Sequence, residues 1–541
     1  MKKFYLMIMS LFAVIFFVSC DFLGSKTTTV NTILIETVEE TSDFSSDTLV
    51  TTSAVTTSSG VLTTTLDSNP TTEVTTNVTT SVTTTQTTTN ITTAITTTEA
   101  TTTETTTTET TTTEINYPII PSGYSLLQDE LEYVGIPSIG EAKILVFAVD
   151  FPDQPISNPS SVLADINIAF NGSSDDLVYE SLHSYYLKSS YNKLNITADI
   201  YGFYRAEHDS SYYETLNDEY YATDPNTGQY LYPNASHPDS DLIYELLSYY
   251  DDVIDYSQYD SNNDGYIDGV YVIYNHDVSY ESGSDLWWAY QYYYMYYDTF
   301  DGVDPNYYVW MGLDFFYEGD EGINARTLIH ESGHMLGLDD YYDYYPDDAY
   351  NKGGLGSFMM DYTIGDHEPF SKILLGWITP IVVEKSMTID LIPHLENGDV
   401  LLIIDEWNNT IFDEYILVMY YTPEGLNELD TDYMFTDPGI VMFHISAAID
   451  NGYNPDSYYY SIFNNNNTDS INKLINIIEA DMDEDIEKFA IVEDSDLFLA
   501  GDSLGYSVYP NYKWYNGNSI NLIIDVISLD SEKAVIEVFF K

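Results

Sequence analysis

The segment from Thr27 to Glu114 limits how much of this chain can fold. It consists of threonine with some serine and scattered glutamate, as in "TTTETTTTETTTTE", and it has few aromatic residues. No lysine or arginine occurs between Lys26 and Lys143. A segment of this composition buries too little apolar surface to offset the entropy that is lost on ordering. We therefore predict a disordered, extended Thr-rich stalk over residues 21–116, with folded structure only beyond it.

The start of the chain, "MKKFYLMIMSLFAVIFFVSC", has lysines followed by an apolar run from Phe4 to Val18. This arrangement is typical of a secretory signal. Cys20 is the only cysteine, which excludes a disulfide within the chain. Ser19 directly before it resembles the bacterial lipoprotein signal, in which the cysteine is lipidated and becomes the new N-terminus. We expect residues 1–20 to be such a signal and the protein to be membrane-anchored at the cell surface through Cys20. An ordinary cleaved signal or an uncleaved anchor is the alternative.

Net charge excludes one class of partner, and composition permits a folded core. The 541 residues include 87 acidic and 16 basic ones, which gives a formal charge of −71. Nucleic-acid binding needs clustered lysine and arginine, so we expect no nucleic-acid partner. Hydrophobic residues make up 44% of the chain and aromatic residues 15%, which is enough to bury a sizeable core beyond the stalk.

Periodicity divides the rest of the chain near residue 380. Strands are predicted over Lys143–Phe151, Leu194–Arg205 and Asp268–His276, and helices over about Ala325–Leu338 and over residues 369–377. From Ile378 onward most apolar runs have the spacing of strands. We therefore predict an α/β (α+β) domain over residues 117–380 and a β-rich domain over residues 381–541.

The stretch "HESGHMLGLDDYYDY", residues 330–344, carries the clearest chemical signal. Residues four apart lie on one face of a helix, so His330 and His334 can point at one ion. Imidazole nitrogens bind zinc, and a catalytic zinc site keeps an open position for water. Glu331 lies beside that position and can take a proton from the water. The alternative is a helix that carries the same residues as ordinary core and surface positions.

The residues that follow extend the pattern. Gly337 lets the chain leave the helix in a left-handed turn, which can return Asp340 to the ion as a third ligand. The spacing is that of the metzincin signature HExxHxxGxxH, with aspartate in the last position. Met360 could form the methionine-containing turn below such a site. Tyr362, two residues later, could stabilise the oxyanion of the reaction.

This stretch, together with "MMDYTIGDHEPFSKILLGW", resembles the immune inhibitor A-type family of secreted bacterial zinc metallopeptidases. The stretches "ILVFAVDFPDQ", "SSYNKLNITADIYGFYR", "YDSNNDGYIDGVYVIYN" and "EYILVMYYTPEGLN" are also similar, so the resemblance covers roughly residues 140–540. It implies a metzincin-like catalytic domain with His330 and His334 as zinc ligands and Glu331 as catalytic acid and base.

Asp340 matches the aspartate of that family, whereas Asp339 stands where the family often has proline. His367 and Glu368, in "GDHEPF", are alternative third ligands. Family positions of this kind can also support structure alone, so the resemblance leaves the third ligand open.

A second ion, calcium, is predicted in "DSNNDGYID". Its oxygen donors fall at positions 1, 3, 5, 7 and 9 of a calcium loop: Asp260, Asn262, Asp264, the Tyr266 carbonyl and Asp268. Tyr271 occupies position 12, where the full motif has glutamate. The alternative is an Asx-rich turn ahead of a strand.

Taken together, these features predict a surface-anchored zinc endopeptidase that hydrolyses extracellular proteins or peptides. The alternative of a different class is a catalytically inactive surface adhesin or binding protein that retains the peptidase fold. A zinc hydrolase acting on something other than protein is a third, less specific alternative.

Overall fold

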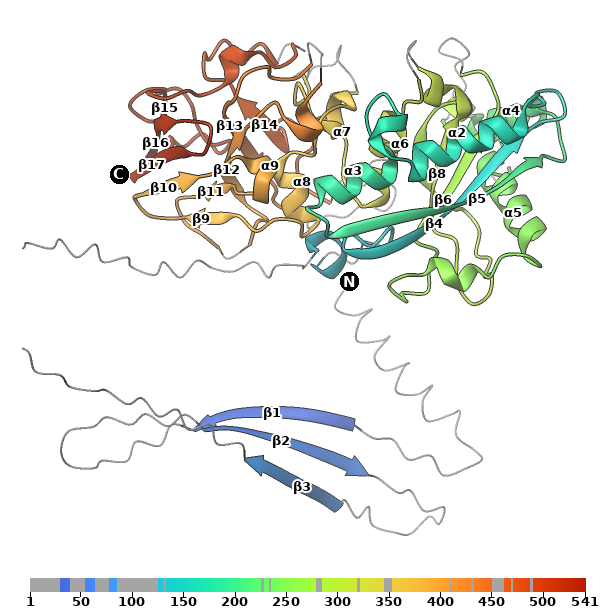
Figure 1. The fold of residues 1–541 in the computed structure, drawn as a ribbon, viewed down its shortest axis with the longest axis horizontal. Coiled ribbons are helices and arrows are strands. Elements are labelled where there is room, and N and C mark those ends of the chain that lie inside the picture. Colours follow the sequence, from blue (N-terminus) through green and yellow to red (C-terminus); the bar gives the residue numbers. More distant parts are fainter. Residues whose placement is uncertain are drawn as a thin grey trace, which may run out of the picture. The chain divides into compact units, whose positions relative to one another are not determined.

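The structure is a computed structural model of the 541-residue chain (Figure 1). It describes residues 30–38, 54–63, 77–84 and 125–541, except for the internal positions 131–132, 225–227, 233–234, 279–284, 319–321, 345–352, 409, 430–432, 450–461, 469 and 487–489. The predicted signal and Cys20 lie outside the described residues. Within the part that is described, none of the helices combines the length and the apolar composition needed to cross a membrane.

The chain divides into two units, Met1–Thr112 and Thr113–Lys541. In the first unit, strands β1 (Val30–Val38), β2 (Ala54–Thr63) and β3 (Asn77–Thr84) pair in an antiparallel sheet. The β-branched threonines and valines of these strands favour extended backbone. The remainder of the predicted stalk lies outside the described residues, so its disorder stays a prediction.

The second unit begins with a five-stranded sheet of order β5-β4-β6-β8-β7. Its strands are β4 (Gly140–Asp150), β5 (Leu194–Arg205), β6 (Val270–Tyr274), β7 (Tyr290–Tyr293) and β8 (Tyr307–Gly312). The first four strands of that order run parallel, and β7 is antiparallel to β8 at one edge. The three predicted strands are confirmed as β4, β5 and β6. The last is shorter than predicted, and the backbone N–H of Asp268 donates to the carbonyl of Tyr259, 2.7 Å away, outside the sheet.

Helices cover both faces of this sheet, which explains the unbroken apolar run of β4. Ile144 and Val146 point into one core, and Leu145 and Phe147 point into another. The first core contains residues of α2 (Pro159–Asn171), α3 (Leu182–Ser189) and α6 (Arg326–Met335), and the second contains α5 (Pro238–Tyr250) with Tyr213 of α4 (Ser210–Tyr221). Figure 1 shows α2, α3 and α6 on one side of the sheet and α5 on the other. The predicted mixed α/β character is confirmed.

Residues after 380 form two further sheets, of orders β14-β13-β12-β11-β9 and β10-β17-β16-β15. The strands are β9 (Ile381–Val383), β10 (Met387–Leu391), β11 (Leu401–Ile403), β12 (Glu414–Tyr421), β13 (Gly439–Ser446), β14 (Ile475–Ile478), β15 (Ser503–Gly505), β16 (Leu522–Leu529) and β17 (Ala534–Phe540). The β-rich composition predicted for this part is confirmed.

The two parts of the second unit share a core, and β12 shows how. Alternate residues of a strand point to opposite faces. Ile416 and Val418 lie in the core between the two C-terminal sheets. Leu417 and Met419 lie in the core that also contains residues of α3 and α6. The C-terminal part is therefore packed directly against the part that carries the histidine helix.

Candidate metal centre

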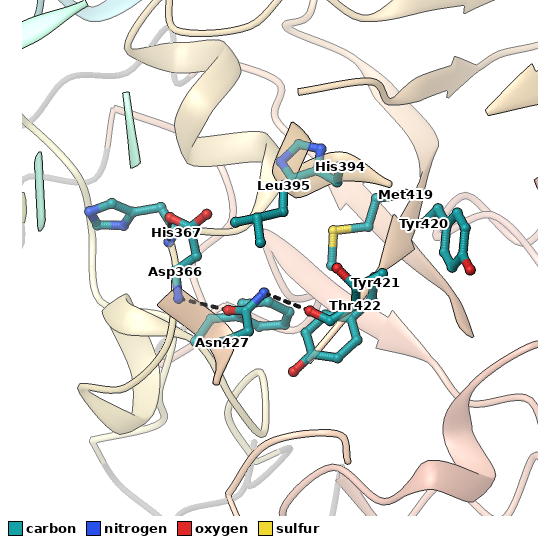
Figure 2. Close-up of a pocket in the computed structure, with 10 residues that line it drawn as sticks. Asp366, His367, His394, Leu395, Met419, Tyr420, Tyr421, Thr422 and Asn427 are labelled. Atoms are coloured by element: carbon teal, nitrogen blue, oxygen red, sulfur yellow. Dashed lines mark hydrogen bonds between the residues drawn. The ribbon is translucent and has the colours of Figure 1, made fainter. Parts of the chain in front are cut away.

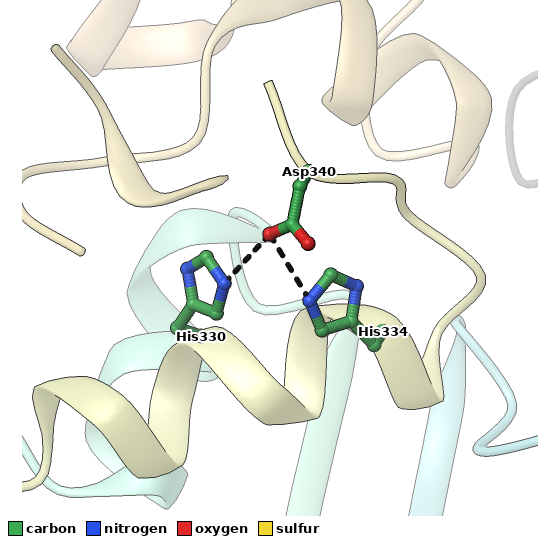
Figure 3. Close-up of side chains that lie close together, drawn as sticks. All are labelled: His330, His334 and Asp340. Atoms are coloured by element: carbon green, nitrogen blue, oxygen red, sulfur yellow. Dashed lines mark hydrogen bonds and ion pairs between the residues drawn. The ribbon is translucent and has the colours of Figure 1, made fainter. Parts of the chain in front are cut away.

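Helix α6 places His330 and His334 one turn apart, with both rings on the same face (Figure 3). The Nδ1 atom of His330 lies 2.8 Å from the carbonyl oxygen of Met359, and that of His334 lies 2.8 Å from the carbonyl oxygen of Leu338. A carbonyl oxygen only accepts, so both Nδ1 atoms carry the hydrogen and donate it. Both Nε2 atoms therefore face Asp340, and once deprotonated they can donate lone pairs to a metal.

Asp340 returns to these rings after a left-handed turn at Gly337, whose φ is +96°. Its Oδ1 atom lies 2.9 Å from Nε2 of His330 and 3.3 Å from Nε2 of His334. Atoms bound at 2.0–2.1 Å around a tetrahedral zinc ion lie about 3.3 Å apart. The two distances to Oδ1 are thus close to that spacing, and all three donor atoms lie within 4.8 Å of one another. Figure 3 shows the three side chains facing one another.

The charges of these three side chains favour the binding of a cation between them. Two imidazole nitrogens and one carboxylate oxygen this close together need a positive charge among them, carried by protons or by a metal ion, to offset the repulsion of their lone pairs. Burial lowers the pKa of His334, but the charge of Asp340 outweighs burial and raises that pKa to about 10. Burial raises the pKa of Asp340, but the imidazoles outweigh burial and hold it well below its usual range. The donor set of two imidazoles and one carboxylate is one that catalytic zinc sites use in hydrolases.

Glu331 lies next to His330 on α6 and is only 7% exposed. Burial raises the pKa of its carboxyl group, and the neighbouring histidines lower it. The backbone N–H of Gln291 in β7 also acts on this carboxylate and lowers the pKa. The antiparallel edge strand β7 therefore borders the proposed proton acceptor.

A short helix, α7 (Met359–Tyr362), forms where a turn was predicted, and it supports the site from below. Met360 is buried, and its Sδ atom would lie 2.5 Å from a Cβ atom added to Gly333. Glycine at this position thus lets the sulfur approach the histidine helix. The Met360 carbonyl accepts a hydrogen bond of 2.8 Å from the backbone of Tyr341. The predicted methionine turn therefore contacts both the helix and the loop that carries Asp340.

Sequence reasoning missed Tyr342 and Tyr344 as parts of the site. The hydroxyl of Tyr344 donates to Oδ2 of Asp340. The ring of Tyr342 stacks on that of His330, with centroids 6.3 Å apart, and the Tyr344 ring packs on Tyr342 at 4.8 Å. Both tyrosines stand in "DDYYDY", residues 339–344, so a sequence signal was present close to the predicted ligand Asp340. In a chain with 52 tyrosines, however, that signal does not stand out.

The two alternative third ligands lie elsewhere. His367 is buried among aromatic rings, including those of Tyr185 and Trp377, and neither of its ring nitrogens has a partner among the described residues. Burial holds its pKa well below the usual value. Glu368 caps helix α8 (Pro369–Leu374) by accepting from the backbone of Ser371 at 3.0 and 3.1 Å. Of the three candidates, Asp340 is the one whose carboxylate joins the two histidines.

Tyr362, predicted to stabilise the oxyanion, is 36% exposed. Its ring packs against that of Tyr433, with centroids 5.1 Å apart. The predicted role is not tested by this contact, and it stays a prediction.

The predicted calcium loop adopts a compact turn held by its own side chains. Asp260 accepts from the backbone of Asp264 and of Gly265, and Asp264 accepts from that of Tyr266. Asn262 donates to Asp264. Within the described ranges, the carboxylates of this loop do not form a group of three close enough to share an ion; besides the histidine centre, such groups occur only around Glu479. This geometry is that of the alternative, an Asx-rich turn, and calcium here stays a prediction.

A small cavity lies between the two parts of the second unit, but it is not a substrate cleft. It holds about 10 Å³ of free volume, about the space that one water molecule needs. Figure 2 shows Asn427 between Asp366, whose N–H donates to it, and the Thr422 carbonyl, which accepts from it. His394 also lines this cavity. These contacts tie the turn after α7 to the C-terminal part.

Comparison with models of known protein families gives no match, and comparison with curated proteins gives none either.

Proposed function

We propose that this protein is a zinc-dependent endopeptidase displayed on the outer face of a bacterial membrane. The observation that carries the proposal is the convergence of His330 Nε2, His334 Nε2 and Asp340 Oδ1. A buried glutamate, Glu331, lies beside them on the same helix. The metzincin-like fold and the likeness to the immune inhibitor A-type family belong to the same proposal.

His330, His334 and Asp340 would hold the ion, which would supply the Lewis acidity that makes a water molecule easier to deprotonate near neutral pH. Glu331 takes the proton from that water and gives it to the leaving amine nitrogen. Its burial favours this role, because a carboxylate that is poorly solvated accepts a proton more readily. Strand β7, at the edge of the central sheet, lies next to Glu331.

The anchor and the substrate class rest on the sequence. Cys20 after an apolar signal supports lipidation, and the Thr-rich segment supports a spacer between the membrane and the catalytic unit. Extracellular proteins or peptides are the substrates that such a location makes accessible. Calcium in the Asp260 loop is proposed as a structural ion on ligand spacing alone.

The test is digestion of a diverse peptide library by the chain expressed without residues 1–20, with products read by mass spectrometry. We expect zinc to copurify, a chelator to stop cleavage, and added zinc to restore it. A chain that binds zinc yet cleaves no peptide would favour the binding-protein alternative. A chain that cleaves peptides equally well after complete removal of metal would overturn the proposal.

A further inference from the structure

The loop that follows Asp340 is held by the C-terminal part of the chain. The amide nitrogen of Asn467 donates to the carbonyl of Tyr341 at 2.8 Å. The hydroxyl of Thr468 donates to the carbonyl of Tyr342 at 3.2 Å and accepts from the backbone N–H of Tyr344 at 3.3 Å. Three of the four residues after the proposed third ligand are therefore hydrogen-bonded to one turn more than a hundred positions later in the sequence.

That turn is itself rigidly placed. Asn467 is 1% exposed, and its amide nitrogen also donates to Ile475 at 2.9 Å. Its oxygen accepts from the backbones of Leu474 and Ile475 at 3.0 and 3.2 Å. Ile475 is the first residue of β14, an edge strand of the C-terminal sheet. Because every hydrogen-bonding position of the buried amide is used, the turn cannot move without breaking bonds to the sheet.

The loop in turn sets the orientation of the carboxylate. Tyr344 donates to Oδ2 of Asp340, while Oδ1 faces His330 and His334. A carboxylate can rotate about its Cβ–Cγ bond and exchange its oxygens, and a hydrogen bond to one oxygen removes that freedom. Groups that hold a metal ligand in this way typically change metal affinity by about 10–100-fold when they are removed.

We infer that Tyr344 is a positioning residue for Asp340 and that the C-terminal β-rich part, through Asn467 and Thr468, is a structural component of the metal centre. The inference rests on the proposed zinc centre, but it does not depend on which bond the enzyme hydrolyses. It gives the C-terminal part a role in building the site that is independent of any binding of substrate.

The first test is the Tyr344→Phe variant of the chain lacking residues 1–20. Zinc affinity is measured by competition with a chromophoric chelator, and we expect a loss of about 10–100-fold. The visible spectrum of the cobalt-loaded variant should differ from that of the parent, because the ligand field changes when Asp340 is free to rotate. The matched control is Tyr317→Phe. Tyr317 is 42% exposed, which is close to the exposure of Tyr344, and its hydroxyl donates to Asp165 at 2.8 Å on the surface. This control should leave zinc affinity and the cobalt spectrum unchanged.

The second test addresses the link to the C-terminal part. Thr468→Val removes the hydroxyl that bonds Tyr342 and Tyr344, and we expect zinc affinity to fall by less than in Tyr344→Phe. Thr436→Val is its control, because Thr436 bonds Asp494 within the C-terminal part. The double variant Tyr344→Phe/Thr468→Val should lose less affinity than the product of the two single losses, since both act on one chain of contacts.

The outcomes separate this inference from the proposed function. A parent protein that binds no zinc would remove the proposed function itself. A parent that binds zinc, with Tyr344→Phe equal to it in affinity and cobalt spectrum, would overturn the inference alone. If Tyr344→Phe does not fold, the zinc affinity of Thr468→Val is the test. A zinc affinity of Thr468→Val equal to that of the parent would then overturn the inference.

Discussion

The hydroxyl of Tyr133 donates a hydrogen bond to the carbonyl oxygen of His334, 2.7 Å away. A residue that precedes the first strand of the central sheet thus supports the end of the helix that carries the second imidazole. The same segment donates from the backbone of Ile136 to the carbonyl of Met335 at 3.1 Å, and Leu127 and Ile136 are fully buried. The described residues between 125 and 139 therefore belong to the folded core around the candidate metal centre.

The first prediction concerns this hydrogen bond. Tyr133→Phe keeps the ring against Gly337 and removes only the donor, so the free energy of unfolding should fall by about 1 kcal/mol. Urea denaturation of the metal-free protein measures it. Tyr297→Phe, at a fully exposed tyrosine, is the control and should change the free energy by less than about 0.5 kcal/mol. Equal stability of Tyr133→Phe and the parent would show that the bond does not support the helix.

A second prediction concerns the turn between the second and third ligands. Gly337 has a φ of +96°, and an added Cβ would lie 3.0 Å from the Tyr133 ring. Gly337→Ala should cost about 1–2 kcal/mol of stability and should also weaken zinc binding, because the turn that delivers Asp340 must shift. Denaturation and chelator competition measure the two effects.

The matched control for this variant is Gly302→Ala. Gly302 has a φ of +91°, but an added Cβ there meets nothing within 4 Å. It should lose a similar amount of stability and keep its zinc affinity. If both variants lose zinc affinity equally, the effect comes from general destabilisation and the turn has no specific role.

The convergence of the three proposed ligands could be predicted from sequence because it is local. His330, His334 and Asp340 lie within a few turns of chain, and helix periodicity with one left-handed glycine is enough to bring them together. The contacts that support them are not local. Tyr133 is 201 positions from His334, and Thr468 is 126 positions from Tyr342. No short-range pattern reports such pairings, so sequence reasoning did not find them.

The edge strand β7 was missed for a different reason. Strands are recognised by alternation of apolar and polar residues. In "YQYYYMYY" nearly every position is tyrosine, an amphipathic residue that suits either face, so no alternation is visible. The calcium prediction came from spacing alone, which is the same for an ion-binding loop and for an Asx-rich turn.

A third prediction is a pH dependence of stability from His394. It is 6% exposed and lines the small cavity in Figure 2, and burial lowers its pKa from 6.5 to about 3. Between these pH values the unfolded chain binds the proton and the folded chain does not. The free energy of unfolding therefore falls as the pH falls from 6.5, by up to about 1.4 kcal/mol per pH unit from this group.

The His394→Gln variant should remove this contribution. Between pH 6.5 and 5 the free energy of unfolding of this variant should fall less steeply than that of the parent, by up to about 1.4 kcal/mol per pH unit. His208→Gln is the control, because that histidine is exposed and its ring packs against those of Tyr212 and Tyr213 at the surface. Parallel pH profiles for His394→Gln and the parent would show that His394 takes up a proton in the folded state.

The last prediction separates metal binding from proton transfer. Glu331→Gln replaces the carboxylate by an amide of the same shape, so the three ligand side chains keep their neighbours. Zinc content should stay at the parent's level, while kcat falls by a factor of about 10²–10⁴ because the amide cannot accept the proton of the attacking water. Metal analysis and single-peptide kinetics measure the two quantities. Asp340→Asn is the opposite case, since it weakens the ligand set and should lose zinc together with activity. Full activity in Glu331→Gln would mean that another group accepts the proton, and the assignment of Glu331 would then be wrong.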